Sequence, residues 1–245
     1  MIQFFRHIRQ TLLAGNKFSK YLLYAVGEIV LVVIGILIAL QINNWNESRK
    51  SDGLLKTYEK SLIEELRADL GQLASLNSMF LAREKTIQDY FDHFNTVTPD
   101  LDTLKMKIDQ LNTSKNTFNS TAYTIEDLIT TGNLALFEKE KKEAILKLRN
   151  THEKNTYYER ITINTLMNKE ELFIANTDLA FDLGRSLSEH AEVRNWKDDL
   201  ASGQYRLLHN YLSSTINLYK AQEIFNERVR KDTETLLALL EQPTN

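Results

Sequence analysis

Asp89 and His93 are the first residues whose types and spacing suggest chemistry. They lie four positions apart, which places both on one face of a helix, where they would present two ligands to a metal ion. Two ligands do not complete a site, and no second pair at this spacing stands out among the five histidines. We interpret both residues as solvated helix positions and expect no metal site.

Other catalytic and cofactor motifs are missing from the sequence. The chain has no cysteine, which excludes disulfides and thiolate zinc sites. It has no Gly-rich phosphate loop, no G-x-S-x-G elbow and no H-E-x-x-H pair. The run EKEKKE at residues 138–143 alternates in sign, which is typical of a solvated helix face and not of a nucleic-acid patch. We expect the protein to be no enzyme, to carry no cofactor and to bind no nucleic acid.

Aromatic side chains at helical spacing offer a second kind of site, a ligand pocket between helices. They are Tyr157, Tyr158, Phe80, Phe91, Phe94, Tyr211, Tyr219 and Phe225. The same spacing is more typical of ordinary core packing. A polar interruption from Thr151 to Asn155 leaves three interpretations open: a water-lined layer, a device that fixes helix register, or a locally exposed turn or bend.

Glu28 is the one charged residue in the long apolar run from Tyr21 to Ile42. A carboxylate near the middle of a bilayer costs a few kcal/mol if it faces lipid, so such residues usually turn toward protein. The same helical face carries Leu31, Gly35, Ala39 and Ile42. Gly35 and Ala39 form a small-x-x-x-small pair, which lets another helix approach closely. We predict that Glu28, Gly35 and Ala39 form an interface inside the membrane. The alternative is a protonated Glu28 that the bilayer tolerates.

The apolar run that contains Glu28 predicts a transmembrane helix over residues 21–42. At about 1.5 Å per residue it spans roughly 33 Å, which matches the hydrocarbon core of a bilayer. A cleaved signal peptide is the competing interpretation, but it needs a shorter apolar core and a small-x-small cleavage site, which QINNWNESRK lacks. We therefore expect an uncleaved membrane anchor.

Charge on the two sides of this span predicts its orientation. Residues 1–20 carry no acid and four basic residues, which we interpret as membrane-surface anchors together with the interfacial Trp45: Arg6, Arg9, Lys17 and Lys20. Residues 43–245 carry 26 basic and 32 acidic residues, a net charge of −6. Apolar residues at helical spacing make residues 1–20 a basic amphipathic helix suited to an anionic cytoplasmic leaflet; the alternative is a basic flank without fixed structure. We predict that the N-terminus is cytoplasmic and that the C-terminal domain lies across the membrane.

The rest of the chain predicts an all-α domain over residues 43–245. The 245 residues include only 8 Gly and 2 Pro, too few for the tight turns of a sheet protein. Apolar stripes of helical period predict helices from Leu55 to about Asn95, from the Thr98-Pro99-Asp100 start to about Asn112, over Ile125–Thr131, from Leu134 to about Phe181, and from Trp196 to Leu240. Residues 113–121 and 184–194 are expected to be loops. These helices should pack as an antiparallel bundle, and the span can continue unbroken into the first of them.

Residues 4–47 resemble the N-terminus of an uncharacterised family of single-pass membrane proteins common in the Bacteroidota. The resemblance rests on FFRHIRQTLLAGNKFSKYLLYAVGEIVLVVIGILIALQINNWNE and, further along, on LITTGNLALF at residues 128–137. It implies a bacterial inner-membrane protein with a periplasmic helical domain. It implies no activity, because the family is a domain of unknown function.

Three classes of function fit these observations. The first is a membrane-tethered helical bundle that self-associates, or joins a membrane-protein complex, as a structural, interaction or accessory subunit. The second is a periplasmic module that binds a small ligand between helices and works with a membrane partner. The third is an ion or proton path built on Glu28 in an oligomer. We favour the first, with the lipid bilayer as one partner.

Overall fold

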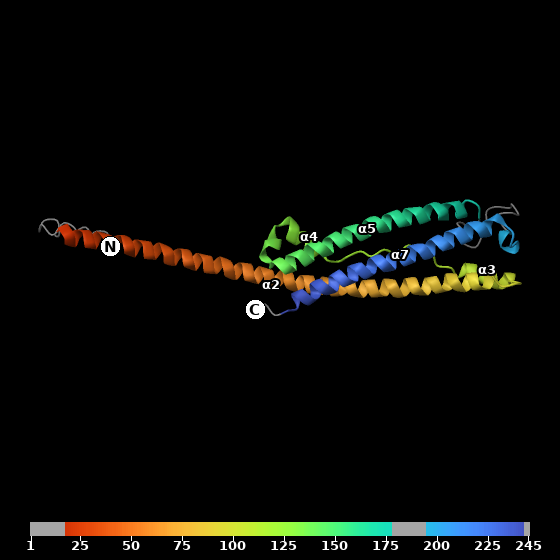
Figure 1. The fold of residues 1–245 in the computed structure, drawn as a ribbon, viewed down its shortest axis with the longest axis horizontal. Helices are drawn as coiled ribbons and strands as arrows, with labels where there is room; N and C mark the ends of the chain where they lie inside the picture. Colours follow the sequence, from red (N-terminus) through yellow and green to blue (C-terminus); the bar gives the residue numbers. More distant parts are fainter. Residues whose placement is uncertain (1–17, 178–194, 243–245) are drawn as a thin grey trace. The chain divides into compact units, whose positions relative to one another are not determined.

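The computed structural model describes residues 18–177 and 195–242, and within these ranges all regular structure is helical. The prediction of an all-α chain is confirmed. The helices are α2 (Phe18–Phe94), α3 (Leu101–Asp109), α4 (Tyr123–Thr130), α5 (Lys139–Ile174) and α7 (Gly203–Leu240), with short 3₁₀ helices η1 (Asn133–Leu136) and η3 (Trp196–Asp198) (Figure 1). The predicted amphipathic segment over residues 1–20 and the predicted connection over residues 184–194 lie almost wholly outside the described residues.

Helix α2 runs for 77 residues without a break. The predicted continuation of the span into the first helix is therefore confirmed, and the reason is local: no proline falls between residues 18 and 94. Gly53, the one strong breaker between Trp45 and Leu55, stays helical, and the hydroxyl of Thr57 donates to its carbonyl. The chain divides into two compact units within α2, Met1–Thr57 and Tyr58–Asn245. The domain boundary predicted at residues 42–43 concerns the membrane and stays a prediction.

Helix α3 begins later than its sequence signal indicates. Thr98 was the expected N-cap, with Pro99 in the first turn, but the N-cap is Asp100. The carboxylate of Asp100 accepts a hydrogen bond from the backbone N–H of Thr103 at 2.8 Å. Hydrogen bonding from the side chain and from the backbone N–H of Thr103 lowers the pKa of Asp100. An acidic side chain suits this position because it satisfies an N–H that has no partner within the helix. The helix ends at Asp109, three residues before the predicted end.

Short turns lie between helices α4 and α5 and before α7, and they move the starts of α5 and α7 away from the predicted positions. Helix α4 ends before Gly132, whose φ of 77° lies in the left-handed region that glycine adopts at little cost. The predicted helix from Leu134 begins instead at Lys139, because Leu134 belongs to η1. The predicted start of the last helix at Trp196 is likewise a 3₁₀ turn, and α7 follows from Gly203.

Within the unit Tyr58–Asn245, the directions of the three long helices follow from their contacts. Thr151 contacts Asp232 while Glu170 contacts Tyr211, so α5 and α7 are antiparallel. Ring contacts pair Phe80 with Tyr219 and Tyr90 with His209, so α2 and α7 are antiparallel too. Helices α2 and α5 are therefore parallel to each other. The predicted antiparallel bundle is confirmed for the two pairs that α7 forms.

The chain returns between α2 and α5 through α3, the non-helical residues 111–122 and α4 (Figure 1). We call residues 111–122 the central segment, because they contact α2, α5 and α7 along the bundle. The segment was expected to be a loop, and it forms no helix or strand. Its contacts nevertheless place it among the helices, so it contributes to the core.

Candidate functional site

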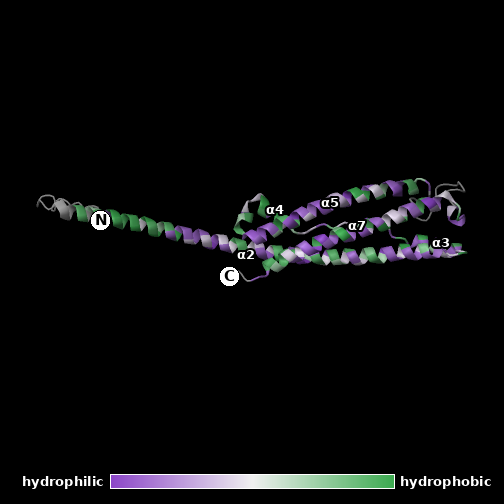
Figure 2. Cartoon of the chain, in the orientation of Figure 1, coloured by the Kyte–Doolittle hydropathy of each residue, from purple (hydrophilic) through white to green (hydrophobic). Residues whose placement is uncertain are grey.

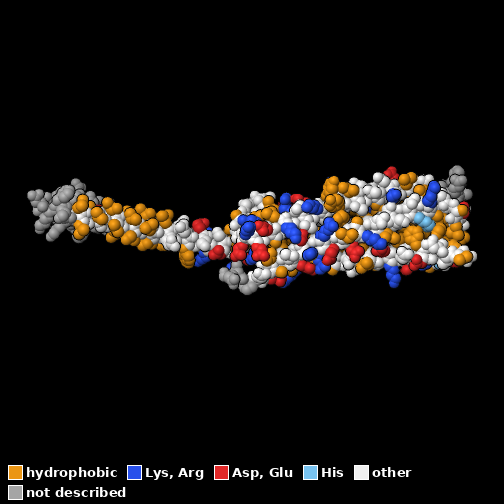
Figure 3. All heavy atoms as spheres, in the orientation of Figure 1, with side chains coloured by type: hydrophobic (Ala, Val, Ile, Leu, Met, Phe, Trp, Pro, Cys, Tyr) orange, Lys and Arg blue, Asp and Glu red, His pale blue; other side chains and the backbone are white. Residues whose placement is uncertain are grey.

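The N-terminal part of α2 carries apolar side chains on all faces, and no other described part of the chain covers them. From Leu22 to Ile42, fourteen large aliphatic side chains are between 47% and 79% exposed. Figures 2 and 3 show this part of α2 as almost uniformly hydrophobic. At roughly 1.5 kcal/mol for each side chain, exposing this surface to water would cost about 20 kcal/mol. Among the described residues, this helix is the one long and apolar enough to cross a membrane.

The predicted interface residues share this surface. Glu28 is partly buried, whereas Gly35 and Ala39 are exposed. A Cβ atom added at Gly35 would meet no other atom within 4 Å, so the small-residue face is open to another helix. The structure describes one copy of the chain, and the predicted interface stays a prediction.

Of the predicted membrane-surface anchors, Trp45 is the one whose side chain is described. It is 64% exposed, and the guanidinium of Arg49 lies 5.9 Å from the centre of its ring, a cation–π contact. Arg6, Arg9 and Lys17 lie outside the described residues. Lys20 lies in α2, but its side chain is not described. The aromatic anchor is thus present at the end of the apolar run, paired with a cation.

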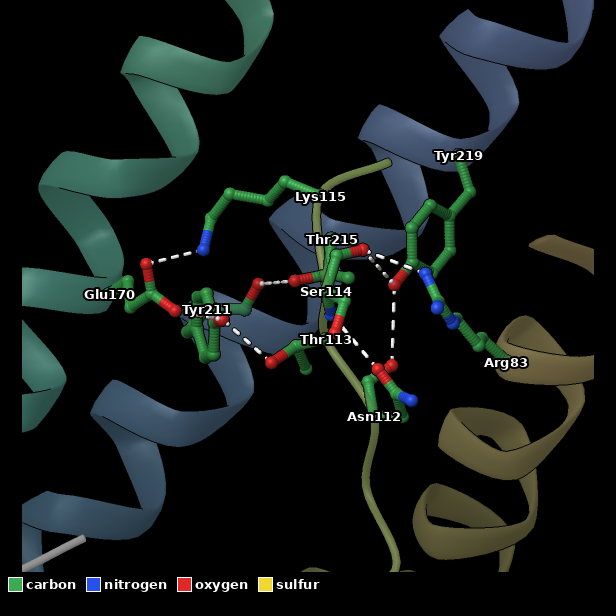
Figure 4. A network of polar contacts seen from close by, with 9 residues as sticks. All are labelled: Arg83, Asn112, Thr113, Ser114, Lys115, Glu170, Tyr211, Thr215 and Tyr219. Carbon is green, nitrogen blue, oxygen red and sulfur yellow. Dashed lines mark hydrogen bonds and ion pairs between the residues drawn. The ribbon is translucent and has the colours of Figure 1, made fainter. Parts of the chain in front are cut away.

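The bundle contains a second candidate site, where the central segment is clamped by polar side chains from all three long helices (Figure 4). From α2, Arg83 donates to the carbonyl of Ser114 at 2.9 Å and to the side-chain oxygen of Asn116 at 2.8 Å. From α7, the hydroxyl of Tyr219 lies 3.3 Å from the carbonyls of Asn112 and Ser114. These bonds satisfy backbone carbonyls that a non-helical segment would otherwise leave unpaired inside the bundle.

Glu170 of α5 completes this clamp. Its carboxylate accepts from Lys115 at 2.5 Å and from the hydroxyl of Tyr211 at 2.7 Å, and Tyr211 in turn accepts from the hydroxyl of Thr113 at 2.8 Å (Figure 4). Burial raises the pKa of the Tyr211 hydroxyl. A polar pocket of about 590 Å³ opens beside this end of the segment, lined by residues 109–115 and Glu170. The arrangement positions the backbone of the central segment and pairs the charges of Lys115 and Glu170.

The other end of the segment is fixed to α2 by two carboxylates. Asp69, which is fully buried, accepts from the hydroxyls of Ser120 and Thr121 and from the backbone N–H of Thr121, at 2.5–2.8 Å. Glu65 accepts from the backbone N–H and the hydroxyl of Thr124 at the start of α4. Both carboxylates have structural partners, so we assign them to the fold.

Between these two ends lies a layer of buried polar side chains, which we call the polar seam: His152, Asn155 and Glu159 from α5, and Gln222 and Asn226 from α7. The segment ties it together, since the amide of Gln222 donates to the carbonyl of Asn116, the N–H of Phe118 donates to Glu159, and the ring of Phe118 contacts that of His152. Buried atoms without a hydrogen-bond partner in the described structure are found in four of the five: His152 Nε2, Asn155 Oδ1, Gln222 Oε1, and Asn226 Oδ1 and Nδ2.

Glu159 supplies the carboxyl group of the seam. It is 4% exposed, and its hydrogen bond from Phe118, at 3.4 Å, is long. Burial raises the pKa of Glu159 to about 7, against a smaller lowering effect of the Phe118 N–H. Burial also lowers the pKa of His152. The seam therefore holds an acid whose pKa lies near neutral pH, because burial disfavours its charged form.

Sequence reasoning found only part of this layer. The interruption at Thr151–Asn155 marked its α5 side, and Asn155 is buried, which excludes an exposed turn at that residue. Glu159, Gln222 and Asn226 were missed, although each occupies a buried position on the stripe of its helix. The signal that could have found them was polar residues repeated at core spacing on two helices.

Of the eight predicted aromatic residues, Phe80, Tyr211 and Tyr219 are buried in the core, and Phe91, Phe94 and Phe225 are partly buried. Phe80 stacks on Tyr219 with ring centres 5.1 Å apart, and Phe94 meets His209 edge to face at 4.4 Å. Tyr157 and Tyr158 differ, because they are 52% and 46% exposed. Of Asp89 and His93, the pair interpreted as solvated helix positions, His93 donates to the carbonyl of Asp100 at 3.2 Å. Within the described residues, no group of three or more His, Asp or Glu side chains is placed to hold a metal ion.

Comparison with known proteins gives one match. The model of a family described as a family of unknown function, DUF6090, matches residues 28–181, more than half of the chain. The resemblance noted in the sequence rests on residues 4–47 and 128–137. The family model covers residues 28–47 of the first segment and all of the second. No curated protein and no solved structure matches the chain.

Proposed function

The chain belongs to DUF6090, a family of unknown function, and we propose that it is a membrane-anchored helical-bundle protein that acts as a structural, interaction or accessory subunit of the bacterial inner membrane. One observation carries the proposal. The apolar surface from Leu22 to Ile42 is uncovered on every side, while the helices from Tyr58 onward bury their own stripes. A bilayer that surrounds the apolar surface removes the cost of exposing it to water. The same bilayer leaves the buried stripes of the bundle undisturbed.

The orientation follows from the charges that flank this surface. Arg6, Arg9, Lys17 and Lys20 precede the span without any acid, and cytoplasmic flanks carry such an excess of basic residues. The bundle then lies in the periplasm. A phosphatase that is active only after export, fused after Asn245, should be active in cells. A fluorescent protein that matures only in the cytoplasm, fused at the same place, should stay dark. The opposite pair of results would reverse the orientation.

The interaction role rests on the face formed by Glu28, Gly35 and Ala39. A carboxyl group near the middle of a bilayer is stabilised by contact with protein. A second copy of the helix supplies that contact, and close approach at Gly35 and Ala39 adds packing that larger residues prevent. We therefore propose that the chain forms a homo-oligomer, or joins a membrane complex, through this face.

Sedimentation of the full chain in mild detergent tests the self-association. Gly35→Ile should shift the chain toward monomer, and Glu28→Leu should weaken association more than Glu28→Gln, because glutamine keeps hydrogen-bonding capacity. Leu37→Phe adds bulk on the opposite helical face and serves as the matched control. If the parent and all variants are monomeric in detergent and alone in the membrane, this face is no interface.

A ligand-sensing role with a membrane partner is the second candidate. It is favoured by a pocket between α5 and α7 that lies outside the clamp and the membrane face. The chemistry of that pocket is specific enough to be argued by itself.

A further inference from the structure

A pocket of about 480 Å³ opens between α5 and α7, over the part of the bundle that holds the polar seam. It lies entirely within the unit Tyr58–Asn245. Pockets for small molecules typically have volumes of about 300–1,000 Å³. The size of this pocket therefore suits a small molecule better than a folded partner. The residues that line the pocket indicate the chemical class of that molecule.

The charge of the lining is strongly positive. It contains four basic side chains and one acid, Asp232. Asp232 is already engaged, because Lys147 lies 2.8 Å from one carboxylate oxygen and the hydroxyl of Thr151 donates to the other at 2.8 Å. The remaining cations, Lys154, Arg228 and Lys231, form no ion pair within 4.0 Å in the described part of the chain.

Arg230, which precedes Lys231 in the sequence, differs from these three cations because it is paired with acids. It is held by two carboxylates of its own helix, Glu227 and Glu234, at 2.5 and 2.6 Å. The hydrogen bond from Arg230 lowers the pKa of Glu227, and the charge of Lys231 makes a smaller contribution. Three cations without an ion pair converge on one pocket of a domain whose net charge is −6. Such a local excess attracts an anion and focuses its approach.

One wall of the pocket is formed by two aromatic side chains. The rings of Tyr158 and Phe225 stack with centres 5.2 Å apart and planes 8° apart. Tyr158 is 46% exposed, although it is an aromatic residue on a helix that buries its own stripe. The guanidinium of Arg228 lies 5.7 Å from the centre of the Phe225 ring, which brings a cation directly beside the aromatic wall.

The floor of the pocket supplies an independent observation. Asn155 lines the pocket, yet it is only 4% exposed, and its side-chain oxygen has no hydrogen-bond partner in the described structure. The antiparallel register set by Thr151–Asp232 and Tyr158–Phe225 places Asn155 level with Arg228, one of the cations that line the pocket. Buried polar atoms without partners are costly, so a polar group that reaches the floor is stabilised there.

We propose that this pocket binds a small organic anion. A phosphate, sulfonate or carboxylate group is held by Lys154, Arg228 and Lys231, and a flat apolar body packs against Tyr158 and Phe225. This site goes beyond the membrane-anchored interaction role and does not depend on it, because every lining residue belongs to the bundle. A failure of the topology or sedimentation tests leaves the site intact, and loss of the site leaves those tests unaffected.

Calorimetry on the full chain tests the chemistry of the ligand. The chain is reconstituted in nanodiscs of zwitterionic phosphatidylcholine, which contain no anionic headgroup, and empty nanodiscs supply the blank. The probes are 1-naphthyl phosphate, inorganic phosphate and 1-naphthol. We expect one 1-naphthyl phosphate to bind per chain, at least about tenfold more tightly than inorganic phosphate or 1-naphthol. It is the one probe with both a phosphate for the three cations and an aromatic body for the aromatic wall. Equal binding of phosphate, equal binding of naphthol, or no heat above the blank overturns the proposal.

Variants then test the location of the site. Lys154→Gln and Arg228→Gln should each weaken naphthyl phosphate binding about fivefold, and Arg228→Lys should restore most of it, because the charge returns. Lys169→Gln changes the same charge on α5 outside the pocket and should leave the affinity unchanged. If Lys169→Gln weakens binding as much as Lys154→Gln, the anion responds to net charge and the pocket is not its site.

The aromatic wall has its own variant. Tyr158→Ala should bring naphthyl phosphate to within about twofold of inorganic phosphate, because the apolar body loses its packing surface. The side chains replaced in these variants are exposed, so helical content and melting temperature should match the parent. An unchanged preference for naphthyl phosphate in Tyr158→Ala would contradict the predicted pose.

Discussion

Replacing Glu159 by glutamine should stabilise the bundle above neutral pH. Glu159 is nearly fully buried in the polar seam, and its one hydrogen bond comes from the N–H of Phe118. Glutamine has the same shape and keeps the oxygen that accepts this bond, so the substitution removes the ionisation and little else. The effect on stability therefore measures the cost of the charge.

The magnitude and its sign follow from the shifted pKa. Burial raises the pKa of Glu159 from its ordinary value of 4.5 to about 7, so the folded state holds the proton more tightly than the unfolded state. Stability from the protonated acid is fully present below about pH 4.5 and is lost as the pH rises through about 7. Each pKa unit corresponds to about 1.4 kcal/mol, so the full difference is about 3 kcal/mol. Between about pH 5.5 and about pH 8, the parent should lose about 2 kcal/mol that Glu159→Gln keeps.

Urea unfolding of the full chain in neutral detergent gives the assay. Trp196 is buried between Phe173 and Tyr205 and reports on the bundle, and Trp45→Phe in all samples removes the exposed second tryptophan. Glu171→Gln changes the same charge at an exposed position of α5 and is the control. If Glu159→Gln and the parent show parallel pH profiles, Glu159 is not ionised against a burial cost, and the reasoning about the seam is wrong.

Three further changes should have measurable effects on the same urea transition. Lys141→Met leaves the carboxylate of Glu59, paired at 2.6 Å with both side chains nearly buried, without its partner. It should cost about 3 kcal/mol, and adding Glu59→Met should recover most of the loss. Asp69→Ala removes the acceptor of three hydrogen bonds from the central segment and should also cost about 3 kcal/mol. If Asp69→Ala and the parent unfold at the same urea concentration, the fold does not depend on these bonds. Burial lowers the pKa of His209, which lies 2.9 Å from the hydroxyl of Tyr90, so the folded state resists protonation. Stability should therefore fall as the pH drops below about 6.5, and His209→Gln should flatten this part of the profile.

The helices could be predicted from sequence because their signal is local. Apolar stripes of helical period gave α2, α5 and α7 their approximate positions, and the absence of proline explains why α2 continues past the span. Helix ends were less certain, because several residues compete for each cap. At the start of α3, Thr98 and Asp100 both carry capping oxygens, and the geometry selected Asp100.

The clamp and the seam could not be predicted, because their partners are distant in sequence. Gln222 bonds Asn116 across 106 residues, and Tyr211 bonds Thr113 across 98. A polar segment such as residues 113–121 normally predicts a surface loop, since a buried one leaves backbone groups unsatisfied. Here Arg83 and Tyr219 satisfy those groups, and neither residue carries a local sign of that role.

The central segment also constrains the order in which the bundle can form. Its contacts to α2 span 31 to 56 residues, whereas those to α7 span about 100, and α7 leaves the ribosome after all of its partners. The contacts to α2 can form while synthesis continues, but the contacts to α7 must wait until α7 has emerged. Loop closure over such distances is slow, because ordering entropy is lost before the contacts form. We expect docking of α7 onto the segment to be the late step of folding, so a nascent chain halted before residue 203 should hold the segment by α2 and α5 alone and exchange its amide protons rapidly.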